Sequence, residues 1–265
     1  MAQKLGLALS LPTIKTAAGS AFENLYALDF DGSNDFVDFG SGSTFTPNSS
    51  GANRGFSISY WAKTSFSRFV TMNKQDNSPA KEWQAKIDTS GTVVFEVFGN
   101  NDGGIKQSLT TDTSAGSFIN VSDGNWHHIV MTFDLTSGSS SLLIYIDGVL
   151  FSDANGGATY ASAGTWAAVI NTSAPFRLAA DSRGFKGVMD EVSMFDAVLT
   201  VTNVNDIYNS GKPGDLTGFG FLIGWWRNGD PTGTGAFPTI VDQSTNSNDG
   251  TMTNMASGDI VTDVP

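Results

Sequence analysis

The sequence lacks several features that would point to particular classes of protein. It has no cysteine among its 265 residues, which excludes disulfides and thiolate metal sites. No apolar run approaches the roughly 18 residues that a membrane-spanning helix needs, so we expect no membrane insertion. Basic residues number 14 against 26 acidic ones, a formal net charge of -12. Because nucleic acids and anionic lipid surfaces are bound through basic faces, this charge argues against both partners.

Glutamate is also scarce. Four of the acidic residues are glutamate and the rest are aspartate; the four are Glu23, Glu82, Glu96 and Glu191. Aspartate favours turns and metal-binding loops, whereas glutamate favours helices. Thirty glycines and many Ser, Thr and Asn residues point the same way. The composition therefore predicts a β-rich, loop-rich protein, and its length suits one large all-β domain.

Short segments of alternating apolar and polar residues follow one another along the chain. This pattern is typical of a β-sandwich or barrel. Asp-Gly at 31–32 and at 147–148 predicts two hairpins. One helix is expected, capped by Thr200 and ended by Gly211 and Pro213. The predicted strands are residues 25–30, 36–39, 56–63, 68–73, 83–88, 92–98, 105–110, 126–133, 141–146, 149–151, 176–180, 187–195 and 219–226.

One predicted strand, residues 187–195, carries a carboxylate among apolar neighbours. With a period of two, Asp190 shares a face with Val188, Val192 and Met194, and Glu191 lies on the opposite face. A buried carboxylate is costly unless hydrogen bonds or a cation satisfy it. Asp190 is therefore expected to have a structural partner.

No arrangement of residues indicates catalysis. The closest pair of glutamates is Glu82 and Glu96, and the only two histidines, His127 and His128, diverge on a strand. A phosphate-binding loop and a Gly-x-Ser-x-Gly motif are both absent from the sequence. We therefore expect a protein that is not an enzyme.

Six segments carry a resemblance to a known family. They are LDFDGSNDFV (28–37), FSISYW (56–61), NWHHIV (125–130), LIYIDG (143–148), FKGVMDEV (185–192) and LT (199–200) before the helix. In this order they resemble the laminin-G-like (concanavalin A-like) jelly-roll family over about residues 25–211. The resemblance implies an all-β fold, a two-sheet antiparallel jelly-roll β-sandwich with one short helix and extended terminal arms. Glucanases of this family use the spacing Glu-x-Asp-x-x-Glu, which this sequence lacks.

The resemblance divides the chain into an N-terminal arm (1–22), a jelly-roll sandwich (23–228) and a C-terminal wrapping segment (229–265). A motif such as Asp242-x-Ser-x-Asn-x-Asn-Asp249-Gly250-Thr251 commonly precedes the sandwich in this family. Here it follows the sandwich, so we expect the C-terminal segment to fold back and add a strand. The arm imitates a secretory signal, but Pro12 cuts its apolar run. We favour an arm that ties the subunit to a neighbour.

The resemblance also implies a structural calcium ion. Calcium takes six to eight oxygen ligands. Three candidates share one turn, and the family pattern places the fourth beside it; the four are Asp31, Asn34, Asp35 and Asp190. The alternative is that Asp31 and Asn34 only cap the turn and that Asp190 accepts backbone N–H groups.

Jelly-roll lectins stack sugars on aromatic rings beside Asp and Asn side chains. The residues of this kind in or next to predicted loops are Trp83, Asn100, Asn101, Asp102, Asp153, Asn155 and Trp166. They form the predicted glycan-binding set. The other tryptophans are expected to belong to the core.

The run from Gly224 to Pro265 resembles the endings of virion structural proteins from aquatic tailed phages. This likeness implies an architectural or adhesive role as a capsid decoration, fibre or tail-associated protein on the virion surface. Its partners would be other virion proteins, or copies of itself through the arm, together with host surface glycan. The alternative is a carbohydrate-binding lectin module that recognises a host receptor or is secreted.

Overall fold

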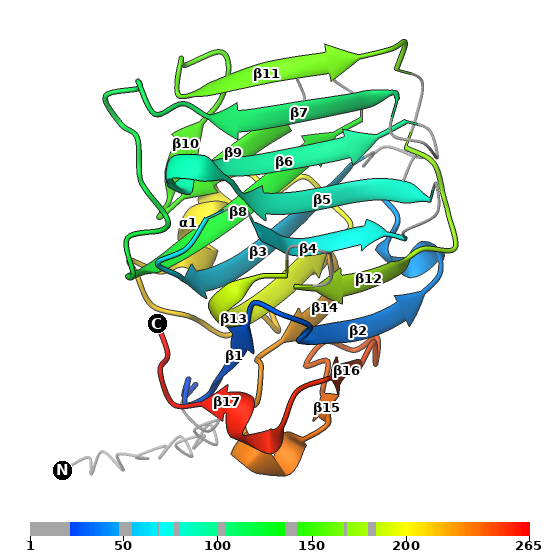
Figure 1. Cartoon of the computed structure of the whole chain (residues 1–265), viewed down its shortest axis with the longest axis vertical. Helices are drawn as coiled ribbons and strands as arrows, with labels where there is room; N and C mark the ends of the chain where they lie inside the picture. The colour runs from blue at the N-terminus through cyan, green and yellow to red at the C-terminus, as the bar shows by residue number, and fades with distance from the viewer. Residues whose placement is uncertain are drawn as a thin grey trace, which may run out of the picture.

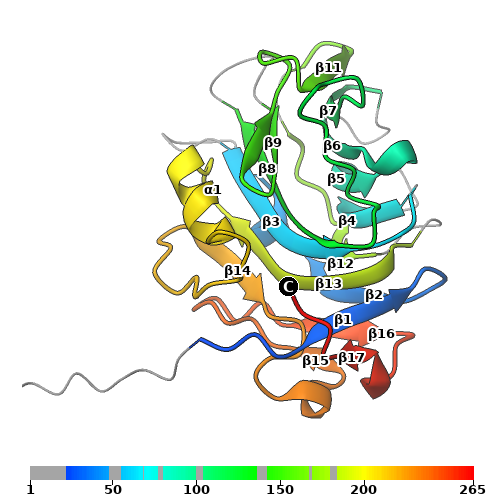
Figure 2. The ribbon, with the colours of Figure 1, turned by 90° about the vertical axis from the view of Figure 1, so that its left-hand side faces the viewer.

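Two antiparallel β-sheets pack face to face in the computed structural model (Figures 1 and 2). The structure describes residues 22–47, 55–67, 69–76, 80–99, 104–135, 142–166, 169–179 and 184–265. Most of the N-terminal arm therefore lies outside the described residues. The predicted two-sheet, nearly all-β architecture with one short helix is confirmed.

The first sheet has the strand order β10-β9-β8-β3-β13-β1-β17, and β14 also pairs with β13. Its strands are β1 (Ala27–Asp31), β3 (Gly55–Lys63), β8 (Trp126–Asp134), β9 (Leu142–Ile146), β10 (Val149–Phe151), β13 (Lys186–Phe195), β14 (Leu222–Trp226) and β17 (Ile260–Val261). β1 pairs with the first half of β13 and β14 with its second half. The two strands therefore lie end to end along one edge of β13.

The second sheet has the order β11-β7-β6-β5-β4-β12-β2-β16-β15. Its strands are β2 (Phe36–Ser41), β4 (Phe69–Gln75), β5 (Lys81–Ile87), β6 (Val93–Phe98), β7 (Lys106–Thr111), β11 (Ala158–Ala163), β12 (Pro175–Leu178), β15 (Thr239–Ile240) and β16 (Gly250–Thr253). β16 pairs with β2. The C-terminal segment therefore adds a strand to this sheet.

Four short 3₁₀ helices join these strands: η1 (Ser43–Phe45), η2 (Thr89–Gly91), η3 (Gly233–Ala236) and η4 (Ser257–Asp259). The first follows β2 at the rim of the sandwich. The other three lie in turns and in the C-terminal segment, which runs below the sandwich in Figure 1.

The core lies between the two sheets and contains the alternate residues of β3 that the sequence pattern predicted. Phe56 is fully buried, and its ring contacts those of Trp83, Phe95 and Phe133 at centroid distances of 5.6, 5.7 and 6.2 Å. Burying one such ring contributes about 1.5–3 kcal/mol. Aromatic packing of this kind stabilises the sandwich without disulfides.

Helix α1 (Val201–Tyr208) covers the outer face of the first sheet (Figure 2). Thr200 caps it as predicted, because its Oγ1 accepts from the Asn203 backbone N–H at 3.2 Å. Its C-cap is Asn209 in the left-handed conformation, two residues before Gly211. Val204 and Ile207 pack in a second apolar cluster between the helix and the sheet.

One of the two predicted hairpins is confirmed and the other is wrong. β9 and β10 pair across Asp147-Gly148. β1 and β2 do not pair, because β1 belongs to the first sheet and β2 to the second. The turn between them is closed by the Asp31 backbone N–H, which donates to Asp35 Oδ2 at 3.0 Å. Each strand pairs with distant partners instead, so the turn carries the chain from one sheet to the other.

β13 contains a β-bulge that a strict period of two did not predict. Its pairing with β3 runs from Asp190 opposite Trp61 to Ser193 opposite Ser59, so β13 has one extra residue here. Glu191 takes a φ of 47°, in the left-handed region. Bulges of this kind re-aim side chains within a strand.

The bulge corrects the predicted faces of β13. Met189 faces the core before the bulge, and Val192 and Met194 face it after the bulge. Asp190 therefore lies on the outer face, apart from those two apolar side chains. Glu191 bonds to residues of the outer face as well, so the two acids are not on opposite faces. The predicted burial of Asp190 is confirmed, since it is 0% exposed.

Candidate functional site

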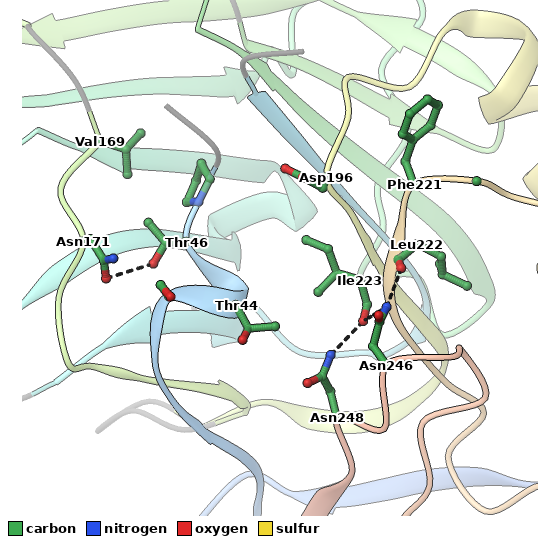
Figure 3. A pocket seen from close by; sticks show the side chains of 13 residues that line it. Thr44, Thr46, Val169, Asn171, Asp196, Phe221, Leu222, Ile223, Asn246 and Asn248 are labelled. Atoms are coloured by element: carbon green, nitrogen blue, oxygen red, sulfur yellow. Dashed lines mark hydrogen bonds between the residues drawn. The ribbon is translucent and has the colours of Figure 1, made fainter. Parts of the chain in front are cut away.

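A cleft of about 720 Å³ opens at the rim of the sandwich (Figure 3). We call it the rim cleft. Five segments line it: residues 43, 44, 46 and 47 after β2, residues 169 and 171 before β12, Asp196 directly after β13, residues 220–223 at the start of β14, and residues 246 and 248 before β16. Both sheets and the C-terminal segment therefore contribute to one concave site.

Helix η1 forms one wall of the rim cleft. Phe45 anchors this wall, because its ring is 3% exposed and its carbonyl accepts from Trp83 Nε1 at 3.1 Å. Thr44 and Thr46 flank it and carry hydroxyl groups at the cleft (Figure 3). Thr46 Oγ1 lies 3.4 Å from Asn171 Oδ1 on the neighbouring segment.

A buried ion pair holds the segment that carries Asn171. Lys74 Nζ lies 2.8 Å from Glu82 Oε1, and both side chains are fully buried. The same carboxylate oxygen accepts from the Thr172 backbone N–H at 2.6 Å and from Thr172 Oγ1 at 2.8 Å. Lys74 also donates to the Ala174 carbonyl at 2.9 Å. These three hydrogen bonds fix residues 172–174 beside the cleft.

The opposite wall is made of β14 and the loop before β16. Asn246 Nδ2 donates to the carbonyls of Leu222 at 2.8 Å and Ile223 at 3.0 Å. Asn248 Nδ2 donates to the Ile223 carbonyl at 2.8 Å (Figure 3). The asparagines thus join the C-terminal segment to the first sheet.

Asp242 holds the same loop through hydrogen bonds to its carboxylate. Its carboxylate accepts from the backbone N–H groups of Trp225 at 2.9 Å, Ser244 at 2.8 Å and Asn248 at 2.9 Å. Trp226 Nε1 donates to the Asn248 carbonyl at 2.7 Å. The Asp-x-Ser-x-Asn-x-Asn motif therefore holds this loop through hydrogen bonds from the backbone to Asp242. It is the sequence signal that could have located this wall of the cleft.

The rim cleft has one exposed aromatic ring and one charge among its described lining residues. Phe221 is 55% exposed and is one of the lining residues labelled in Figure 3. Asp196 is the ionisable residue of the lining, and its backbone N–H donates to the Phe221 carbonyl at 2.8 Å. The other polar groups are hydroxyls and amides. This combination can hold a hydroxyl-rich ligand with one apolar face.

The predicted glycan-binding residues do not line the rim cleft. Trp83 is wrong as a candidate, because it lies within β5 and is 0% exposed in the core. Asn100, Asn101 and Asp102 fall outside the described residues. Trp166 is half-buried and packs edge-on against Phe133 at 5.7 Å.

Asp153 and Asn155 are exposed but form the turn that follows β10. Asn155 Oδ1 accepts from the backbone N–H groups of Ser152 and Gly157 at 3.0 and 2.9 Å, and its Nδ2 donates to the Leu150 carbonyl at 3.0 Å. These bonds give Asn155 a structural role in the turn. A glycan site at this turn stays a prediction.

The predicted calcium ligands are not all brought together. Asp31 pairs with Lys186 across the strands, whereas Asp190 lies four positions further along β13. At about 3.3 Å per residue this separates the two by about 13 Å. The placement of Asp190 beside the Asp31–Asp35 turn is therefore wrong. Within the turn, Asp31 Oδ1 accepts from the Ser33 backbone N–H at 2.7 Å, and Asn34 is exposed.

Asp190 instead lies in a buried polar cluster with Asn24, near the start of the described chain, and with Asn228 and Asp230, which follow β14. Asn24 Nδ2 donates to Asp190 Oδ2 at 2.8 Å, and the Glu191 backbone N–H donates to Oδ1 at 2.7 Å. Burial and the neighbouring Glu191 raise the pKa of Asp190 well above its ordinary value. In the described part of the chain, three buried oxygens near it have no hydrogen-bond donor: Asn24 Oδ1, Asn228 Oδ1 and Asp230 Oδ1. Hard oxygens of this kind suit a calcium ion.

Glu191 forms an ion pair with Arg227. Arg227 Nε donates to Glu191 Oε1 at 2.9 Å, and Trp225 Nε1 donates to the other carboxylate oxygen. Arg227 also reaches Asp230 and the Glu23 carbonyl. Burial nevertheless raises the pKa of Glu191 to about 7, against the lowering effect of Arg227.

The two histidines and Glu96 are engaged in structural contacts. His128 is 1% exposed, its ring contacts those of Trp61 and Tyr208, and its Nε2 lies 2.8 Å from Ser59 Oγ. Burial lowers the pKa of His128 to about 3. His127 lies within hydrogen-bond distance of two aspartates. Glu96 forms ion pairs with Lys86 and Lys106 on neighbouring strands.

Comparison with known families gives one match. A family model described as the concanavalin A-like lectin/glucanases superfamily matches residues 31–205. No curated protein matches the chain. Among the described residues, no helix is long and apolar enough to cross a membrane.

Solved structures share the fold at low sequence identity. A protein from Bacteroides ovatus, provisionally assigned as a carbohydrate binding protein, matches with a TM-score of 0.57 and 17% identity. The match covers 92% of this chain and 62% of that chain, so the present chain spans less than two thirds of it. The botulinum neurotoxin serotype D binding domain overlaps less, with a TM-score of 0.48, 15% identity, and coverage of 73% and 44%.

Proposed function

Because this chain belongs to the concanavalin A-like lectin/glucanases superfamily, we propose that it is a non-enzymatic carbohydrate-binding domain that holds a glycan in the rim cleft. The Bacteroides ovatus protein of the same fold is provisionally assigned to carbohydrate binding, which is in keeping with this proposal.

The composition of the rim cleft is the observation that carries the proposal. Sugars present hydroxyl groups at their edges and C–H groups on their faces. The cleft offers an exposed ring, Phe221, for a sugar face and the side-chain oxygens and hydroxyls of Thr44, Thr46, Asn246 and Asn248 for its edges. Its volume of about 720 Å³ lies within the range of small-ligand sites.

The positions of the carboxylates favour binding over hydrolysis. Glycoside hydrolysis requires two carboxylates on either side of the scissile bond. Among the described lining residues of the rim cleft, Asp196 supplies the carboxylate and no glutamate is present. Glu82 and Glu96 are held in ion pairs on strands β5 and β6. We therefore assign the cleft a binding role.

We place this domain in an adhesive component of a phage virion, in contact with host surface glycan. This placement is supported by the resemblance of residues 224–265 to the endings of virion structural proteins. The alternative is a secreted lectin. Mass spectrometry of purified virions from the source tests the two, because only a virion component co-purifies with the capsid proteins at fixed stoichiometry.

A structural calcium ion belongs to the same proposal. The residues that would hold it are Asp190, Asn24, Asn228 and Asp230, which differ from the predicted set in all but Asp190. The unpartnered side-chain oxygens of Asn24, Asn228 and Asp230 support this assignment. A bound ion would supply the positive charge that neutralises Asp190 and would tie residues 22–25 and 228–230 to β13.

The glycan-binding role is tested by a glycan array followed by titration calorimetry with the best ligand. Phe221→Ala should weaken binding at least tenfold, because it removes the exposed ring of the cleft. Phe66→Ala is the matched control, since Phe66 is 46% exposed but does not line the cleft. The proposal is wrong if the array shows no ligand, or if the two variants bind equally well.

A further inference from the structure

A second pocket, of about 480 Å³, lies beside β14. It shares no lining residue with the rim cleft, so the proposed glycan site does not account for it. The lining residues that matter below are Phe22, Glu23, Leu25, Asp215, Trp225 and Arg227.

The cation of this pocket is already paired. Arg227 Nε lies 2.9 Å from Glu191 Oε1, and its Nη2 lies 3.1 Å from Asp230 Oδ2. The guanidinium carbon also lies 4.2 Å from the ring centroid of Phe22 and 5.5 Å from that of Trp225. The two rings stack on each other at 6.2 Å. Arg227 therefore belongs to the wall of the pocket, and its charge is matched by acids of its own cluster.

Two carboxylates of the pocket are not paired in this way. Glu23 and Asp215 are exposed, and neither forms an ion pair with a described residue. The backbone N–H and hydroxyl of Thr217 donate to Asp215 Oδ1 at 2.9 and 2.7 Å. Leu25, which is 45% exposed, adds an apolar surface. The pocket therefore suits a lysine, which packs its alkyl stem on apolar groups and keeps its ammonium group at the charged rim.

The chain has a segment of matching chemistry in residues 1–21, which lie outside the described residues. The charged residues of this arm are Lys4 and Lys15, and it contains no acid. Each lysine has an aliphatic neighbour, Leu5 or Ile14. The protein as a whole carries a formal charge of -12, so two copies repel each other. A basic arm exchanged between the copies offsets this repulsion.

The place where the arm joins the sandwich favours exchange with a neighbour. The arm ends at Phe22, which itself lines the second pocket. Figure 2 shows the described chain entering β1 from the outer edge of the sandwich. Twenty-one extended residues span up to about 70 Å, enough to reach an adjoining copy. In a pair related by a twofold axis, each arm then starts beside the pocket that receives the other arm, so both exchanges form together.

We propose that the second pocket binds a lysine of the N-terminal arm of a second copy of this chain. The ammonium group pairs with Glu23 and Asp215, and the aliphatic neighbour of the lysine packs on Leu25. The product is a dimer joined by reciprocal exchange of arms. This inference goes beyond the proposed glycan-binding function and does not depend on it.

Sedimentation velocity of the full chain over a range of concentrations tests the proposal. We expect the wild-type protein to dimerise, with a dissociation constant that rises with salt. Asp215→Lys should raise this constant at least tenfold, because it places a like charge against the arm. Asp112→Lys is the matched control. Asp112 Oδ1 accepts from the backbone N–H and hydroxyl of Ser114, both at 2.8 Å, as Asp215 does from Thr217, but Asp112 does not line the pocket.

Charge reversal on the arm identifies the bound lysine. Of Lys4→Glu and Lys15→Glu, the variant that removes the bound lysine should also raise the dissociation constant at least tenfold. Combined with Asp215→Lys, the same variant should restore dimerisation to within severalfold of the wild type. Asp215→Asn keeps an acceptor for Thr217 and should weaken the dimer about threefold. It replaces Asp215→Lys in the comparison if the lysine lowers the melting temperature.

Each contrary outcome overturns a named part of the proposal. A wild-type protein that stays monomeric at every concentration excludes exchange of arms. A dimer that neither substitution of Asp215 weakens, or that Asp112→Lys weakens equally, excludes the second pocket as the contact. A dimer that depends on Asp215 but on neither Lys4 nor Lys15 excludes the arm as the occupant. Glycan binding in the rim cleft is measured separately and stands or falls by its own test.

Discussion

Replacing Lys74 with methionine tests how the buried ion pair supports the wall of the rim cleft. The side chains of Lys74 and Glu82 are both 0% exposed, with Nζ and Oε1 2.8 Å apart. Removing the amine leaves the Glu82 carboxylate buried without a cation. Loss of one partner of such a pair costs about 3–5 kcal/mol. We expect Lys74→Met to lower the free energy of unfolding by this amount.

A second substitution in the same background shows whether the cost comes from the uncompensated charge. In Lys74→Met/Glu82→Gln the side chain is neutral, yet its carbonyl oxygen can still accept from the Thr172 backbone N–H and hydroxyl. The double variant should therefore recover most of the lost stability, to within about 2 kcal/mol of the wild type. Urea unfolding followed by tryptophan fluorescence measures all three proteins.

The matched control is a partly exposed ion pair in the same sheet. Arg177 Nε lies 2.7 Å from Asp38 Oδ2, with side chains 33% and 26% exposed. Since exposed pairs contribute about 1 kcal/mol or less, Arg177→Met should have a small effect. If Lys74→Met costs no more than this control, or if the double variant is no more stable than the single one, the reasoning from buried charge is refuted.

Three further predictions concern pH, calcium and the helix. Burial raises the pKa of Glu191 from 4.5 to about 7, so the folded state holds its proton longer than the unfolded state and stability falls as pH rises from about 4.5 to 7. Urea unfolding across this range should show that Glu191→Gln removes up to about 3 kcal/mol of this decline. Calcium at 100 times its Kd should raise the free energy of unfolding by about 2.7 kcal/mol, which corresponds to a rise in melting temperature of roughly 5–10 °C. EGTA should reverse this rise. Asp190→Asn should abolish the rise, whereas Asp31→Asn should leave it unchanged. Thr200→Ala should cost about 1 kcal/mol in urea unfolding by removing the N-cap of α1, and no loss would contradict the cap.

The features that the sequence predicted well depend on short-range patterns. The alternation of Phe56, Ile58 and Tyr60 identifies the inward face of β3, because successive side chains of a strand point to opposite faces. The Thr200 cap and the β9–β10 hairpin are likewise set by a few adjacent residues. Local chemistry alone fixes such elements.

The features that the sequence predicted wrongly depend on distant partners. Asp31-Gly32 joins two alternating runs as a hairpin turn would, but β1 is taken by β13 and β2 by β12 and β16. The bulge at Glu191 shifts the alternation by one residue, and the bonds that hold this side chain come from Trp225 and Arg227. Neither effect is visible within a window of ten residues.

The rim cleft was missed because no single segment marks it. Thr44, Asn171, Asp196, Phe221 and Asn248 are ordinary polar or apolar residues until the fold brings their segments together. Aromatic residues beside predicted loops were the available signal. That signal selected Trp83, but the ring of Trp83 is buried in the core.

The division of the rim cleft between two parts of the chain has a consequence for specificity. Thr44, Asn171 and Asp196 lie within residues 31–205, which match the family, whereas Phe221, Asn246 and Asn248 lie beyond them. The exposed ring and the two asparagine side chains therefore come from a segment outside the match, attached to β14 by Asp242. Because this segment pairs with β2 through β16, it is part of the folded sandwich. Under the proposed function, changes in residues 220–248 would therefore alter the ligand while residues 31–205 keep the family fold.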